Sequence, residues 1–400
     1  MLSVKDAQSQ IISALSPLEH ESIELAGALH RVCAENIYAK ENSPLFDNSA
    51  MDGYALRSKD TGNAGKTNPI RLEVIEKIPA GYTTSTSLKP HQSCRIFTGA
   101  PMPPGADAVI MQEDTLAKED FVEILRPMRP KENVRFAGED IGAQDLLYQS
   151  GEILDAGAIG LLAAQGITRV KASRRPKIAI VPTGDEIVEL GEDLQPGQIR
   201  NSNAYMLAAQ VKLAGATSTQ SPVAYDSLDA LRHALNQSAK DADMIITCGG
   251  VSVGDFDFVR QIIQEEGSLN FWRVAIKPGK PLLFGHFNGT PLIGLPGNPV
   301  SAFVCFELFA RLGIQKLQGI NPIEHSFEMA KLNKNIQPNK KRTEFLRGKR
   351  FTEAETTYVE PHSKQGSGHL SSITHINTLI EIPPGDKEIK AGTHVKILTL

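Results

Sequence analysis

The sequence predicts a multidomain α/β protein with a β-rich part near the N-terminus and a small β-barrel at the C-terminus. Three observations carry this prediction. At 400 residues the chain exceeds one ordinary domain. Strand-like and helix-like runs alternate over residues 176–325, whereas short strand-like runs between Gly and Pro clusters fill residues 46–136 and 326–400. Apolar residues make up 41% and charged residues 22%, the balance of a folded protein.

The N-terminal part is expected to consist of two helical and linker segments that flank the β-rich part. Residues 1–45 place apolar side chains at helical spacing from Ile11 to Leu18, and a second apolar set follows. Residues 137–175 contain one apolar helix, AGAIGLLAAQG, and a proline-stopped linker. We therefore expect 1–45 and 137–175 to form one domain, into which the β-rich domain 46–136 is inserted.

Residues 176–325 are expected to form a mostly parallel sheet that helices cover on both faces. The strand-like runs include KIAIV, VAYD, DMIITC and FWRVAIK, and helix-like runs separate them. Ligands bind such sheets at the carboxyl ends of the strands. Residues 326–400 lack helical periodicity and predict a small β-barrel or sandwich.

Composition and charge exclude several classes of function. The formal net charge of −4 gives no basic field. The basic run at 331–350 could suggest an RNA-binding patch, but stacking aromatics are absent beyond Phe345 and Phe351, so a solvated face and no nucleic-acid partner are expected. The four cysteines form no C-x-x-C pair, so neither a zinc site nor a disulfide framework is predicted. No apolar stretch approaches a membrane span and the N-terminus lacks a signal core, so a cytoplasmic protein without a membrane partner is expected.

Carboxylates and glycines follow the predicted strands of the α/β domain. VPTGDEI places Asp185 and Glu186 after one strand. TCGGVSVGDFDF supplies Gly249 and Gly250, which let backbone N–H groups approach a phosphate, and then Asp257 at a helix start. A lone Asp there can simply cap the helix, but several acids on neighbouring loops favour a divalent cation held by oxygen ligands. Mg²⁺ is the metal that fits these ligands.

Cationic and hydrogen-bonding residues follow in the same domain. WRVAIKPGKP contributes Arg273, Lys277 and Lys280 around a Pro-Gly turn, and LPGNPVS contributes Asn298 and Ser301 before a helix. Solvated surface lysines are the alternative interpretation. Cations beside acids predict a dianionic ligand that a divalent metal bridges to the carboxylates.

Three polar motifs lie outside the α/β domain. They are FDNSAMDGYAL with Asp52, FTGAPMPPGAD with Thr98, and NVRFAGEDI with Arg135 and Asp140. A structural turn or a surface ion pair explains each of them alone. These three motifs indicate a function only in combination with the other motifs of the chain.

Taken in order, these motifs resemble the signature segments of the molybdopterin molybdenumtransferase family, MoeA, which includes the C-terminal part of gephyrin. The resemblance rests on FDNSAMDGYA, RIFTGAPMPPGADAV, GEDI, TGDE, CGGVSVGDFDF, AIKPGKP and LPGNPVS, and it spans nearly the whole chain. It implies four domains, a homodimer, and a MogA- and MoaB-like molybdopterin-binding domain. The implied reaction is Mg²⁺-dependent insertion of molybdenum from molybdate into adenylyl-molybdopterin, with release of AMP.

The resemblance and the loop chemistry together predict the residues of the site. Catalytic roles are expected for Asp52, Glu186, Asp226, Asp257 and Lys277, and Glu186, Asp226 and Asp257 are expected to bind the metal. The residues expected to contact the substrates are Thr98, Arg135, Asp140, Asp185, Gly249, Gly250, Ser252, Arg273, Lys280, Pro296, Asn298, Pro299, Ser301, Arg342, Arg347, Ser367 and Ser371.

Two departures from the family pattern stand out. Cys248 occupies a position where the family leads us to expect Ser or a similar small residue, and it is predicted to be a buried strand-end residue because no base or cation adjoins it. QGSGHLSS carries an extra Gly, which puts the roles of Ser367 and Ser371 in doubt.

Two alternative functions remain open at the level of sequence. One is adenylylation of molybdopterin by ATP, which a related α/β domain performs, and the other is a noncatalytic gephyrin-like scaffold. The additional N-terminal motifs and C-terminal β part argue against the first, and the retained acidic motifs argue against the second. The expected protein partners are a molybdopterin adenylyltransferase and the molybdoenzymes that accept the cofactor.

Overall fold

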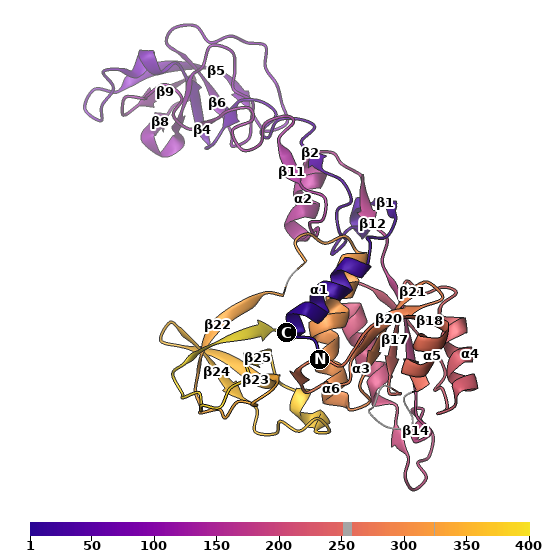
Figure 1. The fold of residues 1–400 in the computed structure, drawn as a ribbon. Coiled ribbons are helices and arrows are strands. Elements are labelled where there is room, and N and C mark those ends of the chain that lie inside the picture. Colours follow the sequence, from indigo (N-terminus) through magenta and orange to yellow (C-terminus); the bar gives the residue numbers. More distant parts are fainter. Residues whose placement is uncertain (251–257, 324) are drawn as a thin grey trace. The chain divides into compact units, whose positions relative to one another are not determined.

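The computed structural model describes residues 1–250, 258–323 and 325–400, and it divides into two compact units (Figure 1). The first unit comprises Met1–Glu35, Ser150–Ile159 and Arg169–Leu400. The second comprises Asn36–Gln149 and Gly160–Thr168. Each unit has its own hydrophobic core, so each is described by itself.

A six-stranded sheet forms the centre of the first unit, in the order β16-β13-β17-β21-β20-β18. The strands are β13 (Lys177–Pro182), β16 (Thr217–Gln220), β17 (Met244–Cys248), β18 (Gly267–Trp272), β20 (Leu283–Phe287) and β21 (Thr290–Leu295). The first four in the sheet order pair in parallel, and β20 and β18 extend the sheet in antiparallel pairings. The expected mostly parallel sheet is therefore confirmed for its central part.

Helices cover both faces of this sheet, as predicted. The helices are α3 (Ser202–Leu213), α4 (Leu228–Ser238), α5 (Phe258–Glu266), α6 (Pro299–Cys305) and α7 (Arg311–Leu317), with a π-helical segment, Phe306–Ala310, between the last two. Alternate residues of β13 explain the two layers. Ile178 and Ile180 pack with α3, α6 and α7, whereas Ala179 and Val181 pack with α4 and α5.

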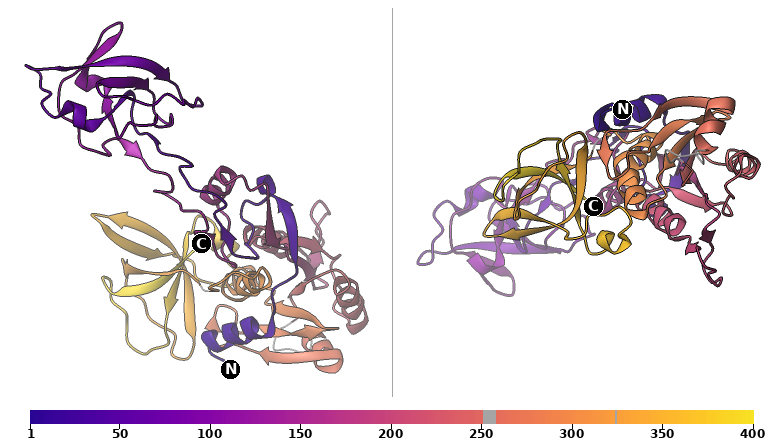
Figure 2. Two further views of the ribbon diagram at one scale, coloured as in Figure 1. Left: turned by 90° about the horizontal axis from the view of Figure 1, so that it is seen from above. Right: turned by 60° about the horizontal axis from the view of Figure 1, so that its bottom comes forward.

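The N-terminal segment is only partly helical. Helix α1 (Val4–Ala14) begins at Ser3, whose side chain accepts a hydrogen bond from the backbone N–H of Asp6. Ile11 and Leu15 join the core of the α/β sheet, and α1 lies beside its helices in every view (Figures 1 and 2). Of the second apolar set, Ile23 lies in strand β1 (His20–Glu24), which pairs with β12 (Arg169–Ser173), and Leu25 begins a single 3-10 turn, so the helical structure expected for this part of residues 1–45 is wrong.

A closed five-stranded barrel ends the first unit, which confirms the predicted β-barrel. Its strands are β22 (Phe327–Leu332), β23 (Thr343–Glu353), β24 (Thr356–Pro361), β25 (Thr378–Ile382) and β26 (His394–Thr399). They follow the order β23-β24-β22-β26-β25, and pairing of β25 with β23 closes the barrel. One short strand of the α/β part, β19 (Ile276–Lys277), adds to the outside of β23.

The second unit is mostly β, as predicted. Its sheet has the order β7-β4-β6-β5-β9-β8, formed by β4 (Gly53–Leu56), β5 (Ile70–Ile78), β6 (Gln92–Ile96), β7 (Ala108–Met111), β8 (Thr115–Ala117) and β9 (Phe121–Ile124). Two short pairs complete the strands, β3 (Asn48–Ser49) with β10 (Val134–Arg135) and β2 (Ile37–Tyr38) with β11 (Leu146–Tyr148). The predicted apolar helix is α2 (Ala156–Ala164), whose residues are shared between the two units.

Two strand predictions are wrong. VAYD makes only an isolated bridge between Ala224 and Thr183. FWRVAIK is divided into β18 and β19, because Arg273 adopts a left-handed backbone with φ of 75°. The hairpin of β20 and β21 was not predicted, although its Asn288-Gly289 turn between apolar runs is a hairpin signal.

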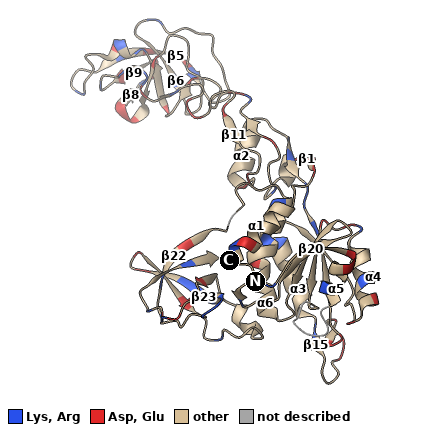
Figure 3. Cartoon of the chain, in the orientation of Figure 1, with Lys and Arg blue, Asp and Glu red and all other residues tan. Residues whose placement is uncertain are grey.

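Both signs of charge are mixed along the chain in Figure 3, in keeping with the net charge of −4. In the described ranges no helix is long and apolar enough to cross a membrane.

Candidate functional site

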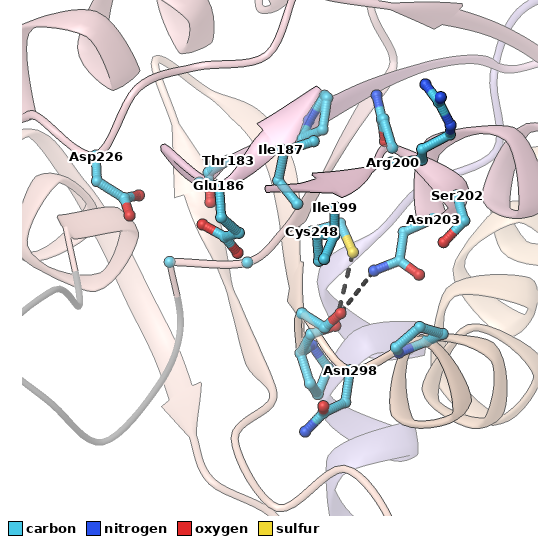
Figure 4. A pocket seen from close by; sticks show the side chains of 18 of the residues that line it. Thr183, Glu186, Ile187, Ile199, Arg200, Ser202, Asn203, Asp226, Cys248 and Asn298 are labelled. Carbon is cyan, nitrogen blue, oxygen red and sulfur yellow. Dashed lines mark hydrogen bonds between the residues drawn. The ribbon is translucent and has the colours of Figure 1, made fainter. Parts of the chain in front are cut away.

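A cavity of about 440 Å³ opens at the carboxyl ends of β13, β17 and β21 (Figure 4). Its wall consists of the loops that follow these strands, together with the beginnings of α3 and α6. Of the predicted site residues that the structure describes, seven line it: Glu186, Asp226, Gly249, Gly250, Pro296, Asn298 and Pro299. The rule that ligands bind at the carboxyl edge of a parallel sheet thus located the cavity from sequence.

Two glycines bring the backbone close to the cavity. Gly249 and Gly250 have φ of 104° and 64°, conformations that glycine adopts without strain. A Cβ on Gly249 would lie 2.6 Å from both the carbonyl and the hydroxyl oxygen of Thr183, and one on Gly250 would lie 2.9 Å from Val259 Cγ2. Any side chain at either position would therefore displace the strand-end loops.

Two carboxylates line the cavity, and a third supports the loop that carries one of them. Glu186 and Asp226 line it, and Asp185 Oδ1 accepts a hydrogen bond of 2.9 Å from the backbone N–H of Asp226. Partial burial, with the negative charges of Asp185 and Glu186, raises the pKa of Asp226 above its ordinary value. Mutual repulsion of this kind is relieved when a cation binds between the acids.

The donor set fits a hard divalent cation, although it is incomplete in the part of the chain that the structure describes. No group of three or more His, Cys, Asp or Glu side chains there could hold a metal ion. Glu186 and Asp226 offer the oxygen ligands that Mg²⁺ prefers, and Mg²⁺ often needs only one or two carboxylates beside substrate phosphates. The third expected ligand, Asp257, and the expected contact Ser252 lie outside the described residues.

The opposite wall of the cavity is polar and was missed by sequence reasoning. It consists of Arg200, Asn201, Ser202 and Asn203, which precede or begin α3. Asn201 caps the helix, and Asn203 Nδ2 donates to the carbonyl of Gly297 at 2.6 Å. The sequence does contain a signal for this wall, because Asn and Ser directly before an apolar helical run mark the start of a helix.

Two buried oxygens of the cavity wall have no hydrogen-bond partner among the described residues. They are Thr183 Oγ1 and Asn203 Oδ1. Buried polar atoms without a partner are uncommon, so a bound ligand with a hydrogen-bond donor is the natural complement.

Cys248 is buried at the end of β17, as predicted. Its thiol is 4% exposed and donates to the carbonyl of Pro296 at 3.6 Å. Burial raises the pKa of Cys248 to about 12, so the group stays a thiol at neutral pH. Ser301, expected to contact a substrate, is buried in α6 and is not part of the cavity wall.

Arg273, Lys277 and Lys280 lie on the segment between β18 and Pro281, and none of the three lines the cavity. Lys277 Nζ makes an ion pair of 2.6 Å with Glu344 of the barrel, and Pro281 reaches the cavity. Gly279, between them, has φ of 103°, and a Cβ there would collide with Cys305. Lys280 is partly exposed, and its carbonyl accepts from the N–H of Val274.

The predicted substrate contacts in the C-terminal part of the chain differ in their exposure. Arg342 donates to the carbonyl of Ile276 at 3.4 Å, and the carbonyl of Ser367 accepts from the N–H of Val300 at the start of α6. Ser371 is exposed. Arg347 does not face a cleft as expected, because it is fully buried and donates to Ser372 Oγ at 3.2 Å and to the carbonyl of Lys364 at 3.0 Å.

In the second unit, three motifs that are distant in sequence converge. Asp52 Oδ1 accepts hydrogen bonds of 2.8 Å from both the N–H and the hydroxyl of Thr98, which lowers the pKa of Asp52. Arg135 pairs with Asn48 across β10 and β3, and the N–H of Asp140 donates to the carbonyl of Ser43. The predicted polar motifs therefore form one region of this unit.

Comparison with protein families matches nearly all of the chain in three parts. Residues 2–166 match "MoeA N-terminal region (domain I and II)", residues 179–316 match "Probable molybdopterin binding domain", and residues 329–400 match "MoeA C-terminal region (domain IV)".

Full-length relatives show the same similarity. A Nostoc protein named molybdopterin molybdenumtransferase is 37% identical over 410 residues, which cover 100% of this chain and 94% of the relative. A Mycobacterium tuberculosis protein named molybdopterin molybdenumtransferase 2 is 35% identical over 406 residues and covers both chains completely. The crystal structure of a molybdopterin biosynthesis moeA protein from Pyrococcus horikoshii superposes with a TM-score of 0.87 at 30% identity, and covers 100% of each chain.

Proposed function

Since the chain belongs to the MoeA family and is accordingly a transferase of molybdenum cofactor biosynthesis, we propose that it inserts molybdenum from molybdate into adenylyl-molybdopterin and releases AMP. The observation that carries the proposal is the cavity at the carboxyl ends of β13, β17 and β21. It lies within the segment that matches a probable molybdopterin-binding domain, and it combines a glycine-lined backbone with two carboxylates.

The glycine-lined end of the cavity suits the phosphates of the substrate. Backbone N–H groups can approach a phosphate at Gly249 and Gly250, since neither carries a side chain. Thr183 Oγ1 and Asn203 Oδ1 are available for polar groups of the pterin. Binding at several points holds the phosphoanhydride in place, and such positioning accounts for much of the acceleration in phosphoryl chemistry.

Glu186 and Asp226, which line the same cavity, would hold Mg²⁺. The bound ion would supply neutralisation of the negative charge that develops on the leaving phosphate. Asp185 acts on Asp226 through the backbone bond and fixes the loop that presents it. Asp257, outside the described residues, is proposed as the further ligand.

Molybdate is a compact dianion and needs cationic donors. Lys277, Arg273 and Lys280 follow β18 on the chain that leads to Pro281 of the cavity wall, and Lys277 is fixed by Glu344. The two dithiolene sulfurs bind molybdenum while the displaced oxo ligands leave as water with the thiol protons. Water attacks the phosphoanhydride, so that AMP leaves and the other phosphate stays on the pterin.

The test is a reconstitution with defined components. Purified protein with adenylyl-molybdopterin, Mg²⁺ and molybdate should release AMP and produce a cofactor that activates an apo-molybdoenzyme. Consumption of ATP with molybdopterin, in the absence of molybdate, would instead identify an adenylyltransferase. Tight binding of a peptide without any turnover would identify a scaffold.

The assembly and location are also proposals. We propose a cytoplasmic homodimer that receives its substrate from a molybdopterin adenylyltransferase and passes its product to molybdoenzymes. All four cysteines are free and buried, which suits a reducing compartment. Analytical ultracentrifugation should give twice the mass of the 43.4 kDa chain.

A further inference from the structure

Arg95 contacts both of the chain segments that carry Asp52 and Thr98 in the second unit. We call Asp52 and Thr98 the aspartate–threonine pair. Arg95 belongs to β6 and pairs with Tyr54 across β6 and β4. Tyr54 is the second residue after Asp52, and Phe97 immediately precedes Thr98. Arg95 was not among the residues predicted for the site.

The guanidinium group of Arg95 bonds to the segment of Asp52 in two ways. Its Nη1 donates to the carbonyl of Gly53 at 3.0 Å, and its Nη2 donates to Oε1 of Gln112 at 2.6 Å. The backbone N–H of Gln112 in turn donates to the carbonyl of Asp52 at 3.1 Å. One planar group of donors therefore fixes the carbonyls of Asp52 and Gly53, the second directly and the first through Gln112.

The same guanidinium group contacts an aromatic ring beside each member of the pair. The Cζ atom of Arg95 lies 5.0 Å from the ring centroids of both Tyr54 and Phe97, within the range of a cation–π contact. Tyr54 belongs to the segment of Asp52, whereas Phe97 belongs to the segment of Thr98. Arg95 therefore holds the two segments together.

The aspartate–threonine pair leaves one carboxylate oxygen free. Oδ1 of Asp52 accepts both bonds from Thr98, whereas Oδ2 has no hydrogen-bond partner among the residues that the structure describes. Asp52 is exposed, so Oδ2 is open to a ligand. The bonds from Thr98 and, to a smaller extent, the positive charge of Arg95 lower the pKa of Asp52 and favour its ionised form. The direction of Oδ2 depends on the backbone that Arg95 fixes.

We propose that Arg95 is a positioning residue that directs Oδ2 of Asp52 toward the reacting groups of the substrate. The inference rests on the proposed function and on the catalytic role expected for Asp52. Both hydrogen-bond acceptors of Arg95 described above are neutral, so its replacement leaves no carboxylate there without a partner and the fold should tolerate it. Misplacement of a catalytic group by about 1 Å can lower a rate roughly 100-fold.

Kinetics of AMP release give the first test. Arg95→Gln should lower kcat roughly 10- to 100-fold and leave the KM for molybdate unchanged, because the cavity of the α/β domain is intact. Arg95→Lys should recover only part of kcat, since an ammonium group keeps the charge but lacks the planar pair of donors. A wild-type kcat in Arg95→Lys would overturn the proposal, because charge alone would then suffice.

Arg71→Gln is the matched control for these variants. Arg71 lies in the same sheet, and its Cζ lies 3.5 Å from the ring centroid of Phe121. The variant therefore also removes a contact between an arginine and an aromatic ring, but away from the aspartate–threonine pair. Its kcat should equal that of wild type.

A second readout does not depend on turnover. Carboxyl-carbon NMR of aspartate-labelled protein, with the signal of Asp52 assigned by its loss in Asp52→Asn, measures the pKa of Asp52. Arg95→Gln should raise this pKa toward 3.8, the ordinary value, and Arg71→Gln should leave it unchanged. An unchanged pKa or an unchanged kcat in Arg95→Gln would overturn the proposal. If wild type released no AMP, the proposed function would fail, whereas the titration would still decide whether Arg95 controls Asp52.

Discussion

Lys277 Nζ lies 2.6 Å from a carboxylate oxygen of Glu344, and Glu344 is 5% exposed within the barrel. The other carboxylate oxygen accepts from the N–H of Asn339 at 2.8 Å. Pairing of β19 with β23 sets the two residues opposite each other. Because a buried carboxylate that loses its partner is unfavourable, Lys277 is expected to stay on Glu344 and to offer its remaining N–H bonds to an anion.

Lys277→Ala should raise the molybdate concentration needed for half-maximal turnover far more than it weakens pterin binding. One cation of the oxyanion site is removed, while the glycine-lined end of the cavity is untouched. The variant should also lose about 1 kcal/mol of stability, since Glu344 keeps its charge but Lys277 is half-exposed and screened. Equal weakening of molybdate binding and pterin binding would instead indicate that Lys277 contacts the phosphate of the pterin.

Two controls separate stability from function at Lys277. The double variant Lys277→Ala with Glu344→Gln should regain stability but keep the raised molybdate requirement. Lys334→Ala, which breaks an exposed ion pair with Glu360 in the same barrel, should change neither quantity.

Asp226→Asn should stabilise the protein in the absence of divalent cations, by about 1 kcal/mol or less. A raised pKa means that the folded state disfavours the carboxylate, so Asp226 lowers stability above its folded pKa. This penalty disappears as the pH falls through that pKa. The advantage in Tm over wild type should therefore shrink on acidification and vanish well below 3.8, the ordinary value.

The same variant tests the metal site. Mg²⁺ should raise the Tm of wild type, and should do so much less for Asp226→Asn. Asp193→Asn removes an exposed charge in a neighbouring loop and should respond to Mg²⁺ as wild type does. If Mg²⁺ raised the Tm of Asp226→Asn as much as that of wild type, Asp226 would not be a metal ligand.

Gly249→Ala should abolish binding of the pterin substrate and destabilise the fold by about 2 kcal/mol. The new Cβ would meet two oxygens of Thr183 at 2.6 Å. Gly191→Ala is the matched control, since Gly191 also has a positive φ, of 93°, but a Cβ there meets nothing within 4 Å. Calorimetry that found equal pterin affinity in both variants would argue against a phosphate site at Gly249.

Cys248→Ser should be nearly silent in turnover and should change stability by no more than about 1 kcal/mol. A serine hydroxyl can donate to the same carbonyl of Pro296, and with a pKa of about 12 the native thiol supplies no nucleophile at neutral pH. Loss of AMP release in this variant would indicate a thiol mechanism.

The fold could be predicted from sequence where periodicity and tertiary packing agree. Alternating strands and helices located the central sheet, and Ile178 and Ala179 show the two-sided burial that makes such strands continuously apolar. The prediction of helical structure near Ile23 was wrong because β1 pairs with β12, about 150 residues away in the chain. Local periodicity cannot register such a long-range partner.

The site could be predicted where chemistry is concentrated in loops after strands. Glu186 and the two glycines were found in this way, whereas Asp226 was predicted from the resemblance to the family. Arg347 was misplaced because it is buried and donates to Ser372 and to main-chain carbonyls of the loop 364–366. That arrangement leaves no local pattern in the sequence.

The most direct test of the proposed function counts AMP and molybdenum in one reaction. Purified protein is mixed with adenylyl-molybdopterin, Mg²⁺ and increasing molybdate, and AMP release is measured together with molybdenum bound to the pterin. The proposed function predicts one AMP for each molybdenum inserted, both dependent on molybdate, and a product that activates an apo-molybdoenzyme. AMP release that is independent of molybdate, or molybdenum insertion without AMP release, would contradict it.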